Sequence, residues 1–103
     1  MLNLTPHSIT IRTPEGDLTI PPSGQVARVS TAETVVGTVL GVQVVERRFF
    51  ELEGLPPEGT PCLVSALVLS ACPGRVGVYA PDSGPTAVRE NGQVVAVTRL
   101  VAA

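Results

Sequence analysis

Glycine and proline divide this chain into short apolar runs, and this punctuation constrains the possible folds more than any other feature. The sequence holds 10 Gly and 10 Pro among 103 residues. They fall between the apolar runs instead of forming a low-complexity tract, which is typical of many short strands joined by tight turns. Only two Phe and one Tyr are present, so a core must be built mainly from Val, Leu, Ile and Ala, a composition that favours strands.

Two segments show the alternation of apolar and polar residues that hairpin strands have. Residues 9–12 alternate, a Pro-Glu-Gly-Asp turn follows at 14–17, and residues 18–20 alternate again. This pattern predicts a first hairpin. Residues 86–90 and 93–101 predict a second, because Asn-Gly between alternating segments is the strongest short-range hairpin signal.

The middle of the chain predicts its longest strand. Residues 25–30 and 34–40 have the composition of strands, and the second run closes at Gly41. Residues 42–52 follow as one long run, whose alternation fails over 46–50. Such a break in parity indicates either a β-bulge or a strand that is covered on both faces.

One segment favours a helix over a strand. Residues 63–71 carry an apolar stripe with helical spacing, Ser65 can cap the helix, and the Pro-Gly pair at 73–74 can end it. We therefore expect one short helix near residues 65–72.

Together these elements predict a single, mainly β domain over residues 1–103. Seven or eight short strands in one flat sheet would leave edges exposed. A small barrel or a two-sheet sandwich, with the one short helix, avoids that problem. We expect one of these two architectures.

Charge and hydropathy indicate the cellular compartment of the chain and the classes of partner that it does not attract. All seven basic residues are Arg, and nine acidic residues give a net charge of −2, so no general field attracts nucleic acid. The N-terminus lacks the pattern of a secretory signal, and no apolar run is long enough to span a bilayer. We expect a cytoplasmic protein without membrane contact. In that compartment Cys62 and Cys72 are expected to be small buried hydrophobes and not a disulfide.

The sequence offers no recognised metal site. His7 is the only histidine, and with Cys62 and Cys72 it could supply three zinc ligands only if the fold brought them together. Their spacing matches no metal-binding pattern, so we expect His7 to be structural and the chain to hold no metal or cofactor.

Catalytic constellations are equally weak. Ser65, Ser70 and Ser83 lie outside any Gly-x-Ser-x-Gly elbow, and apolar surroundings would raise the pKa of the two thiols. Glu51 and Glu53 lie two apart in a strand, where a solvated rim is favoured over paired acid–base groups. We therefore expect a protein that is not an enzyme.

Two loops separated by one short strand gather polar side chains suited to an anion. The first presents backbone N–H groups of a Pro-Gly turn beside a guanidinium, and the second adds hydroxyls and a carboxylate. The predicted ligand-binding residues are Arg75, Asp82, Ser83, Thr86 and Arg89, which Arg28 or Arg48 could join. The structural alternative is that Pro73-Gly74 caps the helix, Asp82 closes an Asx-turn, and Arg75 pairs with Asp82 to brace the loops.

Two further segments indicate contacts between chains. Residues 47–50, Arg-Arg-Phe-Phe, combine basic and aromatic side chains as single-stranded nucleic-acid binders do, but the negative net charge makes nucleic acid an unfavoured partner. We expect one Phe in the core and the other at a subunit contact. Residues 94–101 are apolar on both faces, which indicates a central strand or one buried in a homo-oligomer.

Several phrases of the sequence occur together in one family. The chain resembles a family of small bacteriophage, prophage and bacterial proteins of unassigned function, and the resemblance covers most of its length. The resemblance implies a binding role, to a host protein, a signalling nucleotide or other copies in a particle. The phrases that carry it are N-L-T-P-H at 3–7, P-P-S-G-x-V-A-R-V at 21–29, V-S-A-L-V at 64–68, P-G-R at 73–75 and A-P-D-S-G-P-T-A-V-R at 80–89.

The sequence therefore predicts a non-enzymatic binding domain, expected to be a homo-oligomer, that binds or sequesters a small anionic ligand such as a nucleotide. The alternative is a structural or protein-interaction module with no small ligand. Such a module would contact a partner or a particle through exposed Val and Phe side chains.

Overall fold

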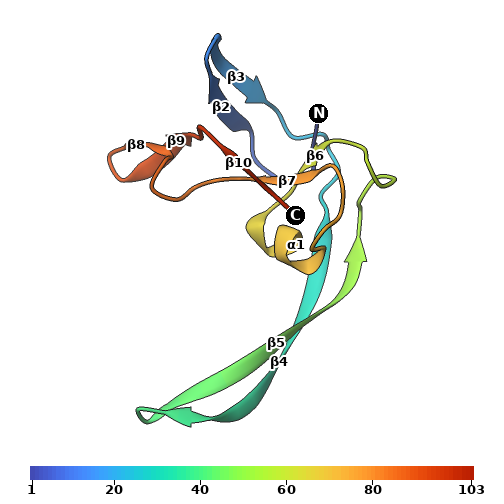
Figure 1. Ribbon diagram of the computed structural model, residues 1–103, viewed down its shortest axis with the longest axis vertical. Coiled ribbons are helices and arrows are strands. Elements are labelled where there is room, and N and C mark those ends of the chain that lie inside the picture. The colour runs from blue at the N-terminus through green and yellow to red at the C-terminus, as the bar shows by residue number, and fades with distance from the viewer.

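The strands form one four-stranded sheet and three separate two-stranded hairpins in the computed structural model, which describes residues 1–103 (Figure 1). The prediction of a mainly β fold with one short helix is confirmed. In chain order the elements are β1 (Leu2–Asn3), β2 (Ile9–Thr13), β3 (Gly16–Ile20), β4 (Arg28–Val39), β5 (Val42–Glu53), β6 (Cys62–Leu63), α1 (Ala66–Ala71), β7 (Val78–Pro81), β8 (Val88–Glu90), β9 (Gln93–Ala96) and β10 (Leu100–Ala102).

The central sheet joins segments from both ends of the chain. Its order is β1-β6-β7-β10, in which β1 and β7 run parallel to β6 and β10 runs antiparallel to β7. The three hairpins attach to this sheet without closing it into a barrel, so of the two predicted architectures the barrel is wrong and a two-sheet arrangement fits. Ten strands form where seven or eight were expected, because β1 and β6 are only two residues long.

A small core holds the sheet and the helix together. Only 14 of the 103 residues are buried, and many apolar side chains of the hairpins remain exposed. The cluster at the centre contains Leu4, Ala27, Cys62, Val64, Val68, Cys72 and Val78.

The short helix forms where the sequence predicted it. Ser65 is the N-cap and its hydroxyl accepts the backbone N–H of Val68 at 3.3 Å, which satisfies one of the free donors of the first turn. Val68 is the helix residue that is buried. No helix in the structure is long and apolar enough to cross a membrane.

A buried amide explains the phrase Asn-Leu-Thr-Pro-His at the start of the chain. The side chain of Asn3 donates to the carbonyl oxygens of His7 and Ile20, at 2.8 and 3.0 Å. Its own oxygen accepts the backbone N–H and the hydroxyl of Thr5, at 3.0 and 2.6 Å. Asn3 therefore fixes the turn between β1 and β2 and ties it to the end of β3, with all its hydrogen-bonding capacity used.

Two of the hairpins form at the predicted turns, although the strand predicted over 93–101 divides into β9, which pairs with β8, and β10, which pairs with β7 in the central sheet. β2 pairs with β3 from Ile9 opposite Ile20 to Thr13 opposite Gly16. β8 pairs with β9 across Asn91 and Gly92, whose φ angles of 52° and 78° are both positive, as a type I′ turn requires.

The third hairpin, β4–β5 (residues 28–53), is called the arm because it projects away from the rest of the molecule (Figure 1). The predicted strands over 25–30 and 34–40 merge into the single strand β4, which pairs with the equally long β5. The parity break predicted in β5 corresponds to a register shift just beyond it, where Glu51 has a φ of 53°. Residues 31–51 are all exposed, so the arm is exposed on both faces rather than covered on both.

Candidate functional site

Four of the five predicted ligand-binding residues lie together after β7: Asp82, Ser83 and Thr86 in the loop, and Arg89 in β8, which follows it. Asp82 organises this loop: its carboxylate accepts the backbone N–H of Gly84 at 3.0 Å and the hydroxyl of Thr86 at 3.5 Å. Arg89 donates to the carbonyl oxygens of Gly84, at 2.9 Å, and of Ser83. The polar groups of the loop therefore bond mainly to each other.

The strongest partner of Asp82 is Arg99, a residue that the sequence analysis missed. The Arg99 guanidinium donates to the Asp82 carboxylate at 3.0 and 2.6 Å. β7 and β10 pair with Leu100 opposite Pro81, so the next residues in this register, Arg99 and Asp82, lie side by side. Only the pairing of two strands that are distant in sequence could have indicated this contact.

These contacts change the ionisation of Asp82. The N–H of Gly84, and after it the Arg99 guanidinium, hold the pKa of the Asp82 carboxyl below its usual value, because each stabilises the charged form. The negative charge of the Asp82 carboxylate is thus already compensated by hydrogen-bond donors of the chain itself.

Arg75 does not belong to this group. It precedes β7 whereas the loop follows it, and a four-residue strand spans about 13 Å. Its guanidinium donates to the carbonyl oxygen of Pro56 at 2.7 Å and so braces the loop over 54–61. The proposed pairing of Arg75 with Asp82 is wrong, because Arg99 occupies that place.

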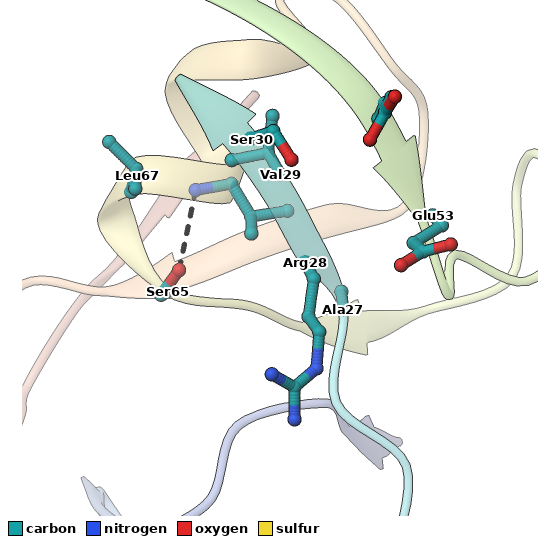
Figure 2. Close-up of a pocket in the computed structure, with 9 residues that line it drawn as sticks. Ala27, Arg28, Val29, Ser30, Glu53, Ser65 and Leu67 are labelled. Carbon is teal, nitrogen blue, oxygen red and sulfur yellow. Dashed lines mark hydrogen bonds between the residues drawn. The ribbon is translucent and has the colours of Figure 1, made fainter. Parts of the chain in front are cut away.

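Arg28 lines a cavity at the base of the arm, together with Ser30, Glu53 and Ser65 (Figure 2). The cavity has a volume of about 370 Å³, within the usual range of ligand sites. Its charged lining residues are Arg28, Glu51 and Glu53, so the lining carries two carboxylates and only one guanidinium. This charge balance repels an anion.

A second cavity of about 190 Å³ lies between β2, β7 and β9. Ser83 of the predicted site contributes to its wall, and the other walls include Ile9, Val94 and Val97. The cavity is smaller than typical ligand sites, and its lining has no charged residue.

The candidate metal and thiol groups are structural. Cys62 and Cys72 are both buried and free, and burial raises the pKa of both thiols, which disfavours the reactive thiolate. His7 is exposed, and its backbone carbonyl is the group that accepts hydrogen bonds. No group of three His, Cys, Asp or Glu side chains could hold a metal ion.

The arm carries more than half of the exposed large apolar side chains of the molecule. Phe49 is 37% exposed and Phe50 is 47% exposed. The expectation that one of them enters the core is therefore wrong. The tip is Leu40, which is 98% exposed and has a φ of 53°. The other exposed apolar side chains of the arm are Val35, Val36, Val39, Val42, Val44 and Val45.

Comparisons with protein-family models, with curated proteins and with solved structures found no match to this chain.

Proposed function

We propose that this protein is a non-enzymatic protein-interaction module that binds another polypeptide through the arm. The observation that carries the proposal is the exposure of residues 31–51 on a hairpin that carries exposed Val and Phe side chains on both faces. A two-stranded hairpin is only marginally stable in water without a further strand or layer against it. A large exposed apolar patch of this kind is typical of a protein–protein interface.

The tip of the arm supports the same function. A leucine in the left-handed region costs roughly 1–2 kcal/mol, and Leu40 gains no burial in return. An apolar residue that is both strained and exposed is expected where it contacts a partner.

A photo-cross-linking amino acid at position 40 tests the proposal in the cells that produce the chain. We expect adducts with another polypeptide, and mass spectrometry would show whether it is a copy of this chain or a different protein. The matched control is position 15, in the tip of the β2–β3 hairpin, where we expect none. No adduct at 40, or equal adducts at both tips, would contradict the proposal.

Binding of a small anionic ligand is the second candidate function. The observation in its favour is that Asp82, Ser83 and Thr86 of the loop lie together with two guanidiniums, Arg89 of β8 and Arg99. It is less favoured because these groups already bond to one another. A panel of nucleotides and phosphates should then stabilise the fold, by about 2.7 kcal/mol at a hundredfold excess over Kd, and Arg89→Ala should abolish the shift.

A further inference from the structure

One face of the arm carries a charge pattern that is complementary to itself. Alternate residues of a strand point to the same face, so Val44, Glu46, Arg48 and Phe50 share one face of β5. Arg47 lies on the opposite face, midway between Glu46 and Arg48. On either side of this midpoint the face presents a charged residue and then an apolar one: Glu46 and Val44 on one side, Arg48 and Phe50 on the other. The two charges are opposite in sign.

Neither charge has a partner within the chain. Glu46 lies opposite Thr34 and Arg48 lies opposite Ala32 in the register of the arm, and neither takes part in any of the three salt bridges. The other face differs, because Arg47 lies opposite Glu33 and pairs with it at 2.9 Å. Between residues 31 and 50, the arm therefore pairs its two charges on one face and leaves Glu46 and Arg48, of opposite charge, without a salt-bridge partner on the other.

We propose that the partner of this face is a second copy of the chain, bound around a twofold axis near Arg47; this inference rests on the proposed function of the arm. Two arms packed face to face and antiparallel would place Glu46 of each copy opposite Arg48 of the other. The same axis would place Phe50 of each copy opposite Val44 of the other. Such a repeated, reciprocal contact is what a twofold interface requires.

The single chain exposes more surface than a compact protein of its mass, by an amount comparable to the area that a dimer interface buries. The chain exposes 6754 Å², whereas a compact monomer of its mass exposes about 5,500 Å². Its radius of gyration is 15.9 Å, whereas about 13 Å is typical of this length. A standard interface buries about 800 Å² on each partner, so a dimer through the arms would remove an area comparable to the excess.

Charge reversal in the purified full chain tests this arrangement by sedimentation. We expect the wild type to sediment with twice the 10.7 kDa mass of one chain. Glu46→Arg and Arg48→Glu should each weaken the dimer by about a hundredfold or more, since both reciprocal contacts become like-charge pairs. An equimolar mixture of the two variants should form a heterodimer, and the double reversal should dimerise like the wild type.

Glu15→Arg is the matched control, because it makes the same charge change at an exposed position outside the arm, in the tip of the β2–β3 hairpin, and should leave the dimer intact. A monomeric wild type at 100 µM, on the order of a weak-contact threshold, would overturn the inference. So would single reversals that still dimerise, or a mixture that does not restore the dimer. If the wild type is monomeric but position 40 cross-links to a different protein, self-association fails and the interaction function stands. If neither is seen, both fail.

Discussion

Asn3 shows how one buried amide can hold together three segments of a small β protein. It is 1% exposed and connects its own strand to the carbonyls of His7 and Ile20 and to Thr5. A buried polar group left without a partner costs about 1–3 kcal/mol. Asn3 therefore contributes to the stability of the fold mainly by giving hydrogen-bond partners to the backbone and hydroxyl groups around it.

Asn3→Ala should lower the free energy of unfolding by about 2–3 kcal/mol, since it leaves several buried or half-buried polar groups unsatisfied. Urea unfolding would measure the change. Ser8→Ala, at an exposed position, is the control and should stay within about 0.5 kcal/mol of the wild type. An unchanged urea midpoint for Asn3→Ala would show that water replaces the amide.

Asp82 makes a contribution to stability that depends on pH. Because its folded-state pKa is lowered, the contribution is fully present above the ordinary carboxyl pKa of about 3.9 and is lost as the pH falls through the folded value. The melting temperature of Asp82→Asn should therefore lie below that of the wild type at pH 7, and the gap should shrink below about pH 4. Glu15→Gln, an exposed carboxyl outside any ion pair, is the control. A gap that is constant from pH 7 to pH 3 would argue against the Arg99 contact.

At the scale of elements, the turns show what local sequence can predict. Asn91-Gly92 and Leu40-Gly41 have nearly the same φ angles, 52° and 78° against 53° and 79°. The first pair is a strong hairpin signal, whereas Leu in that position is not. The β2–β3 and β8–β9 hairpins and the helix after Ser65 could be predicted because alternation, turn residues and capping are local.

The arm and the loop contacts could not be predicted in the same way. The run over 42–52 predicted the length of β5. Alternation indicates a strand only when one face is buried, and the arm is exposed on both faces, so the continuity of β4 and the projection of the arm were missed. The pairing of Arg99 with Asp82 depends on β7 and β10, whose register is set by tertiary packing. Asp82, Ser83, Thr86 and Arg89 could be predicted to lie near each other because they are close in sequence, in one loop and the first residues of the next strand. Arg75 was misplaced because β7 lies between it and that loop.

Replacing the tip residue should change the local stability of the arm without affecting the core. Leu40→Asn should slow amide hydrogen exchange at Val39 and Val42 by about fivefold, because Asn accepts a positive φ at about 1 kcal/mol less cost. Leu40→Val should accelerate it, since a β-branched residue is strained there. Exchange at Val64 in the core is the internal control, because the arm opens separately from the sheet. Equal rates in all three proteins would mean that the turn does not limit opening.

At the scale of the whole molecule, a core of only 14 buried residues makes the stability of the fold depend on contacts with a second copy. If two copies associate through the arms, unfolding includes dissociation and the melting temperature must rise with protein concentration. A hundredfold increase in concentration should add about 2.7 kcal/mol to the apparent stability. Calorimetry of the wild type from 2 to 200 µM, on the order used for weak dimers, would measure it. Arg48→Glu should melt at one temperature throughout, and a wild type that does the same would contradict the dimer.

The central sheet also sets the order in which the protein can be made. β1 comes from residues 2 and 3 and β10 from residues 100–102, so the sheet cannot be completed until residues 100–102 have been synthesised, whereas the arm needs only residues 28–53. A ribosome adds about 5–20 residues per second, and a hairpin forms in about 1–10 µs. During seconds of synthesis the nascent chain can therefore present a formed arm and an open core, and a second nascent chain on the same message would be the first partner within its reach.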